Sequence, residues 1–142
     1  MEVSAVRQQI LQAIDRAKRA AAERRVANDA GTREYEVFLE QLAVPLFRQA
    51  AGILRAEGYP FSLFTPGGSV RLMSDRSADD FLELVLDTTG EKPSVTGRTS
   101  RAWGNRTALS EQPLNPSVPI RELTEEDVLK FLLKALEPFV EK

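Results

Sequence analysis

The sequence contains no cysteine and no histidine among its 142 residues. Disulfides, zinc sites built from thiolates or imidazoles, and nucleophilic dyads or triads that need Cys or His are therefore excluded. Any catalysis would have to use carboxylates, lysine, tyrosine or serine, and no two carboxylates stand out as a hydrolytic pair. We therefore expect a binding protein rather than an enzyme, with no catalytic residue, no metal and no cofactor.

An excess of one charge is also lacking, and so are long hydrophobic runs. The 19 basic and 21 acidic residues give a net charge of −2, which singles out neither nucleic acid nor an anionic membrane as the partner of the whole molecule. Glu2 and Arg7 place charges among the first residues, so the N-terminus lacks the uninterrupted apolar core of a secretory signal. No stretch approaches the roughly 20 apolar residues of a membrane span. We expect a cytoplasmic protein that does not contact membranes.

Helical periodicity marks the first part of the chain. It predicts an amphipathic helix over about 4–29 and a second helix over about 33–57, with a kink or break at Pro45. Gly31 is typical of a helix C-terminus and Thr32 of a new N-cap, so the connection is short. The two helices are therefore predicted to pack as an antiparallel hairpin. The apolar and small residues of the first helix recur in steps of three and four, at Val3, Val6, Ile10, Ala13, Ala17 and Ala20.

After residue 60 the pattern changes to short alternating segments separated by turn residues. The turns are too short for parallel crossovers, so the strands are predicted to pair as an antiparallel meander in sequential order. The third strand is the expected centre of the sheet, with Leu82, Leu84 and Leu86 on its core face. The five predicted strands are Phe61 to Thr65, Ser69 to Ser74, Phe81 to Asp87, Ser94 to Ala102 and Arg106 to Glu111.

A last helix is predicted over about 125–140, because Thr124 and the three acids after it suit the positive end of a helix. The composition, 42% apolar and 28% charged, is that of one compact domain, residues 1–142. The predicted fold is therefore α+β: an N-terminal helical hairpin, a five-stranded antiparallel β-meander within 60–111, and a C-terminal helix packed on the sheet.

The clearest binding signal is the stretch from Lys92 to Ser110, which holds four basic residues, no acid and the only tryptophan. Guanidinium groups grip carboxylates or phosphates, and an adjacent indole provides a stacking surface or an interface anchor. A polar edge hairpin with its tryptophan folded onto the core would explain the same residues. The candidate binding residues are Arg98, Arg101, Trp103, Asn105 and Arg106.

Three other features of the sequence bear on its function. The basic residues of the first helix, together with the same hairpin, would contact phosphates in a nucleic-acid-binding protein. A cluster of acids would serve a carboxylate-based ligand-binding or hydrolytic domain, although it lacks the EF-hand pattern. The turn Pro66-Gly67-Gly68 lacks the residues of a phosphate loop. The basic set is Arg16, Lys18, Arg19, Arg24 and Arg25, and the acidic set is Asp75, Asp79, Asp80 and Glu83.

The alanine-rich apolar stripe of the first helix allows a close approach of a second helix, and it predicts a homodimer. The preferred hypothesis is a small cytoplasmic interaction or adaptor protein whose Arg/Trp hairpin binds an acidic partner. A nucleic-acid-binding protein is the alternative, and the carboxylate-based domain comes third.

Overall fold

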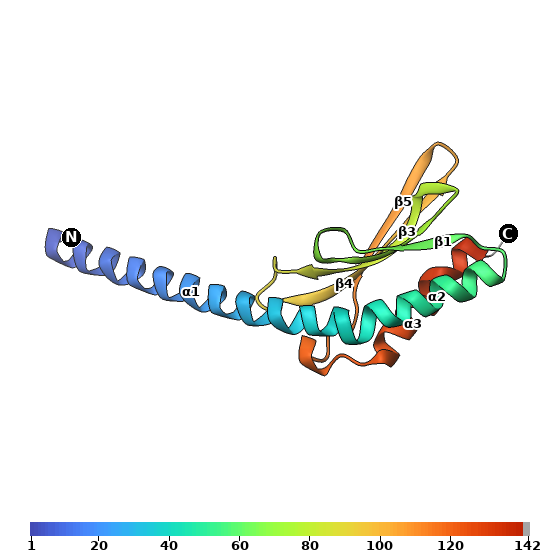
Figure 1. The fold of residues 1–142 in the computed structure, drawn as a ribbon. Helices are drawn as coiled ribbons and strands as arrows, with labels where there is room; N and C mark the ends of the chain where they lie inside the picture. Colours follow the sequence, from blue (N-terminus) through green and yellow to red (C-terminus); the bar gives the residue numbers. More distant parts are fainter. Residues whose placement is uncertain (141–142) are drawn as a thin grey trace.

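The first third of the molecule is one helical rod. In the computed structural model, which describes residues 1–140, α1 covers Val3–Phe38 and leads through the π-helical turn η1, Leu39–Ala43, into α2, Val44–Ala56. The rod runs along the whole length of the molecule (Figure 1). The prediction of an N-terminal helical hairpin, with one helix ending near residue 29 and another beginning near 33, is therefore wrong.

Packing explains why the chain does not turn at Gly31. A Cβ atom built on Gly31 would lie 2.5 Å from Cβ of Pro93, so this glycine gives the loop between β3 and β4 room to touch the helix. Thr32 caps no new helix, because its hydroxyl donates a hydrogen bond to the carbonyl of Asn28, 2.9 Å away in the same helix. The sequence has a helix-ending pattern here, but the glycine serves close approach instead.

The irregularity predicted at Pro45 is present as the π-helical turn just before it. Proline has no N–H to offer the carbonyl of Gln41, and its ring crowds the preceding turn of a regular helix. The wider turn of η1 absorbs this mismatch, and the N–H of Val44 bonds to the carbonyl of Leu39 five residues back. The rod therefore continues past the proline without reversing.

Five antiparallel strands follow in the order β1-β2-β3-β4-β5, which confirms the predicted meander. β3 is the central strand, as predicted, and β4 and β5 form a long hairpin that projects beyond the helices (Figure 1). A short 3-10 turn, η2, Pro66–Gly68, joins the first two strands. The strand bounds are β1 Phe61–Phe64, β2 Val70–Ser74, β3 Ser77–Asp87, β4 Ser94–Trp103 and β5 Arg106–Pro113.

The core lies between the leucine face of the sheet and the helices, as the alternation in β3 predicts. Leu82 and Leu84 are completely buried, and so is Phe47 of α2. Phe131 of α3, Glu125–Val140, packs so closely on β4 that a Cβ on Gly97 would lie 2.4 Å from its ring. Helices α2 and α3 thus cover one face of the sheet.

The helix start predicted at Thr124 is confirmed, and its geometry is that of a capping box. The N–H of Thr124 donates to Oδ2 of Asp127 at 2.9 Å, and the N–H of Asp127 donates to the hydroxyl of Thr124 at 3.3 Å. The side-chain amide of Asn115 also donates to Asp127, at 3.0 Å, which ties the preceding connector to the helix. That connector contains one 3-10 turn, η3, Ile120–Glu122, which lies beside α1.

The first half of α1 leaves the body of the protein. Every residue from 1 to 20 is exposed, and this half projects away from the sheet (Figure 1). The rod from Val3 to Ala56 contains a stretch long and apolar enough to cross a membrane by those two criteria alone. The packed half of the rod buries Phe38, Phe47 and Leu54 against the body, so core packing accounts for much of that apolar character.

Candidate functional site

The β4–β5 hairpin carries the predicted binding residues. Its two-residue turn is Gly104-Asn105, with Gly104 at a φ of 64° and no positive φ at Asn105, as in a type II′ turn. β5 is one of the two edge strands of the sheet, and all of its residues are exposed. The tip of the hairpin therefore stands in solvent, and its outer edge offers unpaired backbone groups.

Trp103 lies at the end of β4 with 63% of its surface exposed, so the indole does not fold back onto the core. The guanidinium carbon of Arg101 lies 4.7 Å from the centre of the indole ring, close enough for a cation–π contact. Arg106 pairs with Trp103 across the turn in the strand register. Because directly paired residues share a face of the sheet, Arg101, Trp103 and Arg106 form one surface, here called the hairpin tip.

Arg98 does not belong to the hairpin tip. It lies three residues before Arg101 on the same strand, which puts it on the opposite face of the sheet. Its guanidinium is 3.0 Å from a carboxylate oxygen of Glu111 and 3.3 Å from one of Glu83. The structure thus separates Arg98 from the other predicted site residues. Asn105 lies in the two-residue turn between Trp103 and Arg106.

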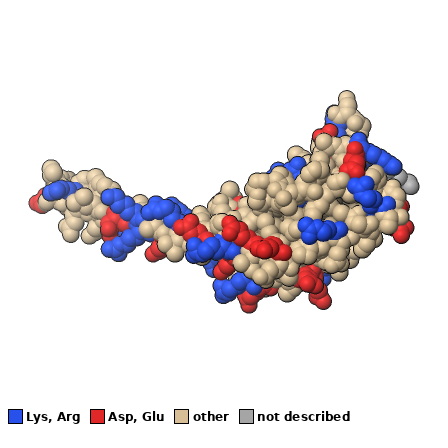
Figure 2. Space-filling model, viewed as in Figure 1, with Lys and Arg blue, Asp and Glu red and all other residues tan. Residues whose placement is uncertain are grey.

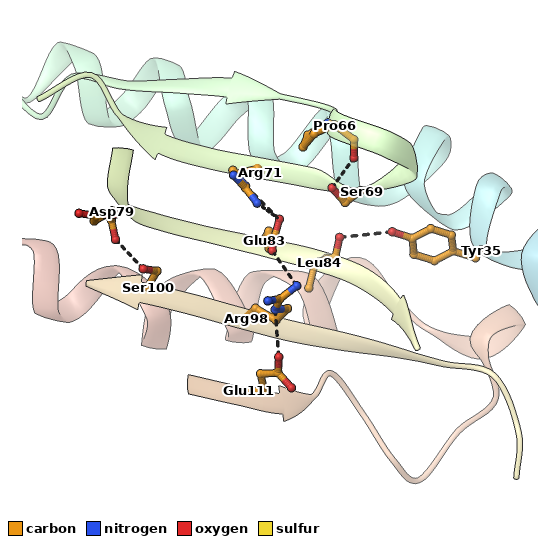
Figure 3. Close-up of polar contacts among 10 residues, drawn as sticks. All are labelled: Tyr35, Pro66, Ser69, Arg71, Asp79, Glu83, Leu84, Arg98, Ser100 and Glu111. Atoms are coloured by element: carbon orange, nitrogen blue, oxygen red, sulfur yellow. Dashed lines mark hydrogen bonds and ion pairs between the residues drawn. The ribbon is translucent and has the colours of Figure 1, made fainter. Parts of the chain in front are cut away.

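Arg98 is part of a row of four alternating charges that crosses the open face of the sheet (Figure 3). The row follows the strand register from Arg71 through Glu83 and Arg98 to Glu111, on β2 to β5. Glu83 is only 2% exposed. Its carboxylate accepts a hydrogen bond from Arg71, whose guanidinium nitrogen lies 2.9 Å away, and forms an ion pair with Arg98. A buried carboxylate between two guanidinium groups locks the strand register, so the row is structural.

Two aromatic side chains border this row. The guanidinium of Arg71 stacks over the ring of Phe81 at 4.1 Å, which holds it against the sheet. Tyr35 of α1 donates a hydrogen bond from its hydroxyl to the carbonyl of Leu84, at 3.3 Å (Figure 3). Burial raises the pKa of the Tyr35 phenol well above its usual range, and the negative charge of Glu83 adds to the rise. Tyr35 is therefore a neutral packing residue.

The acidic stretch from Asp75 to Glu83 does not converge on one site. Asp75 is bound by Ser62 at 2.6 Å and Arg55 at 2.9 Å, and these contacts hold the pKa of its carboxyl below the usual value. Asp80 accepts the N–H of Ala102 at 2.7 Å, and Glu83 is taken up in the charge row. Within residues 1–140 no group of three potential metal ligands comes together.

The basic residues of α1 are spread around the helix. Arg16 and Lys18 are two positions apart, which separates them by about 200° on a helix, and Arg19 is ion-paired with Asp15 at 3.0 Å. Basic and acidic side chains intermingle over the visible face of the molecule (Figure 2). The hairpin tip lies at the other end of the molecule from the projecting helix (Figure 1), so the two do not form one basic surface.

Sequence reasoning missed the charge row. Its members are separated by 12 to 15 residues in the chain, and only the strand register brings them together. Each of the four charged residues is flanked by uncharged residues in the sequence, and that local pattern does not join one strand to the next. Comparisons of the chain with protein-family models, with curated proteins and with solved structures gave no match.

Proposed function

We propose that this protein is a small cytoplasmic interaction protein whose hairpin tip binds an acidic segment of another protein. The observation that carries the proposal is the exposed indole of Trp103 with the guanidinium of Arg101 stacked on it. Tryptophan and arginine are the residues most enriched at the energetic centres of protein interfaces. An indole held in water by a projecting hairpin gains apolar burial only when a partner covers it.

The surroundings of the tip support an acidic, extended partner. Arg101 and Arg76 both line a hollow of about 180 Å³ beside Phe139 of α3, together with Asp80, whose carboxylate accepts the N–H of Ala102. A carboxylate there would meet two guanidinium groups, of which Asp80 balances the charge of one. The neighbouring edge of β5 offers backbone donors and acceptors to an added strand. An acidic strand-forming peptide therefore satisfies both features.

Binding of a panel of acidic peptides tests the proposal. Each peptide alternates Glu or Asp with Val or Ile and carries a fluorescent label, and its affinity is measured by anisotropy. Trp103→Ala and Arg101→Ala should each weaken the best peptide at least about tenfold, because both side chains lie at the centre of the contact. Arg48→Ala removes an exposed arginine from α2 and should change nothing.

Two further measurements decide the outcome. The thermal midpoint should be almost unchanged in Trp103→Ala, since the indole is mainly exposed. Because Trp103 is the only tryptophan, its emission should shift to the blue when the peptide covers it. Equal binding of the variants and the wild type overturns the proposal. Binding of single-stranded nucleic acid in place of the peptides, with a steep loss on adding salt, favours the nucleic-acid alternative.

A further inference from the structure

The charge row on the open face of the sheet ends at the free edge of β5. It passes from Arg71 through Glu83 and Arg98 to Glu111, with one residue on each strand from β2 to β5. The two inner members, Glu83 and Arg98, each lie between two charges of the opposite sign. Glu111 has such a neighbour on one side only, because β5 is an edge strand. The row therefore presents a carboxylate to any strand that is added at this edge.

The carboxylate of Glu111 is anchored to Arg98 and is otherwise open. Its oxygen Oε1 lies 3.0 Å from Nε of Arg98, and within residues 1–140 the other oxygen takes part in no ion pair. The side chain of Glu111 is 63% exposed, whereas that of Glu83 is 2% exposed. Glu83 therefore has its full set of opposite charges inside the protein, and Glu111 has half of such a set.

The backbone of β5 defines where an added strand bonds. In a hairpin with a two-residue turn, the pair that closes the turn exchanges backbone hydrogen bonds, and bonded and non-bonded pairs alternate from there. Trp103 and Arg106 close this turn, so every second residue of β5 from Arg106 onward bonds to β4. The residues between them direct their N–H and C=O groups outward. These residues are Thr107, Leu109 and Glu111.

The outward-bonding residues also share the open face of the sheet with the charge row. They alternate with the residues that share a face with Trp103, so their side chains lie on the opposite face. A strand that bonds to them places its directly opposed side chains on that same face. Leu109, the middle residue, is 69% exposed and favours an apolar residue opposite it. Pro113 has no N–H and ends the edge.

We propose that the strand added to β5 runs antiparallel to it and carries a lysine or arginine opposite Glu111, as the fifth member of the charge row. This inference rests on the proposed binding of a peptide at the hairpin tip, and it names the sequence that the edge selects. Antiparallel pairing continues the pattern of the whole sheet and is the more stable one per residue. A basic residue completes the surroundings of Glu111, whereas an acidic residue would oppose it with a like charge.

The acidic residues of the partner meet the other face of the hairpin. Arg106 shares a face with Arg101 and Trp103 and lies five positions before Glu111. In an antiparallel strand the residue opposite Glu111 therefore comes five positions before the residue opposite Arg106. The selected segment begins with a base, continues with an apolar residue opposite Leu109 and ends with acids, as in Lys-Ser-Val-Glu-Val-Glu.

A second copy of β5 does not supply this strand. In a symmetric antiparallel pair of β5 strands that continue one sheet, opposed residues lie on the same face in both copies. Glu111 would then meet Thr107, Leu109 or a second Glu111. Arg106, the only base of β5, lies on the other face and never meets it. The charge row therefore favours a different protein as the source of the strand.

Two labelled peptides test the selection in fluorescence anisotropy. One is Lys-Ser-Val-Glu-Val-Glu flanked by serines, and the other has Glu in place of Lys. The wild type should bind the lysine peptide at least about threefold more tightly, which is the size expected of an exposed cross-strand pair. Glu111→Lys should reverse this order, and Glu111→Gln should remove the preference. Glu111 is mainly exposed, so both variants should keep the thermal midpoint of the wild type.

A matched control separates the local pair from the overall charge. Glu23→Lys makes the same change of charge on the exposed, projecting part of α1, and it should keep the order of the wild type. Equal binding of the two peptides by the wild type overturns this inference, and so does a reversal of their order in Glu23→Lys. The hairpin-tip proposal still stands in these cases if Trp103→Ala weakens both peptides. Binding of neither peptide overturns both proposals.

A peptide of reversed sequence tests the direction of the added strand. Glu-Val-Glu-Val-Ser-Lys has the same composition and charge, and it places its lysine opposite Glu111 only when it runs parallel to β5. It should bind the wild type more weakly than the original peptide. Tighter binding of the reversed peptide would show a parallel strand and overturn the inference. A chain that dimerises through β5, so that the peptides bind only on dilution, would overturn it as well.

Discussion

The two halves of one helix differ more than any other two regions of this molecule. From Gly31 to Leu54 the rod is packed against the sheet and α3, with Phe47 completely buried. From residue 1 to 20 the same rod is exposed on every side. Both halves carry an apolar face with helical spacing, so the spacing alone does not tell which half belongs to a core. The comparison teaches that an apolar stripe predicts burial but not the identity of the surface that provides it.

The largest expected effect comes from a matched pair of leucines in the rod. Leu54→Ala should lower the free energy of unfolding by about 2–5 kcal/mol, because Leu54 is buried and its removal leaves a cavity. Leu11→Ala should change it by less than about 0.5 kcal/mol, since Leu11 is half exposed on the projecting half of α1. Urea unfolding with an unchanged m-value measures both. Similar losses in the two variants would mean that the projecting half is also packed.

A smaller effect is expected from the glycines of the rod. Gly31→Ala should destabilise the protein by about 1–3 kcal/mol, because the new methyl group would overlap the ring of Pro93. Gly52→Ala should stabilise it by up to about 1 kcal/mol, since the site is open and alanine is the better helix former. Opposite signs in thermal unfolding would show that Gly31 faces the body while Gly52 faces solvent. Stabilisation by both substitutions would contradict the close contact between Gly31 and Pro93.

The smallest effect concerns the two helix starts. Thr124→Ala should cost about 1 kcal/mol by removing the cap of α3, whereas Glu2→Ala should be neutral, because Glu2 makes no capping hydrogen bond to α1. Although burial raises the pKa of Asp127, hydrogen bonds from Thr124 and Asn115 outweigh it and hold that pKa below its usual value. The contribution of Asp127 is therefore present above the unfolded pKa of about 3.9.

That contribution should be lost as the pH falls through the lowered pKa of the folded protein. In Asp127→Asn this part of the acid destabilisation should be absent, which acid titration of the unfolding midpoint measures. An Asp127→Asn protein with the same acid profile as the wild type would contradict the role given to the carboxylate. The cap would then act through Thr124 alone.

Much of the fold could be predicted because its signals are local. Alternation in the strands and the capping box at Thr124 act over a few residues, and both match the structure. The hairpin predicted at Gly31 failed because a glycine that ends a helix and a glycine that admits a neighbouring ring look the same in sequence. The contact with Pro93 is a long-range one, more than sixty residues away in the chain.

The candidate site was predictable as a set of residues and not as a surface. The sequence showed an acid-free stretch with the only tryptophan, and Trp103 is indeed exposed. It did not show that Arg98 and Arg101 lie on opposite faces, since that follows from counting along a strand whose pairing must first be known. The acids that hold Arg98 come from β3 and β5, which no local pattern joins to β4.

The amino-acid sequence by itself determined the five strands, their order, the C-terminal helix and the side of β3 that faces the core, because helix and strand periods are properties of neighbouring residues. Only the tertiary structure decided that the rod is continuous, that one half of it leaves the body, and that Glu83 is buried between two arginines. These features depend on which distant surfaces meet, and the free energy of such contacts is set by geometry that local sequence does not encode.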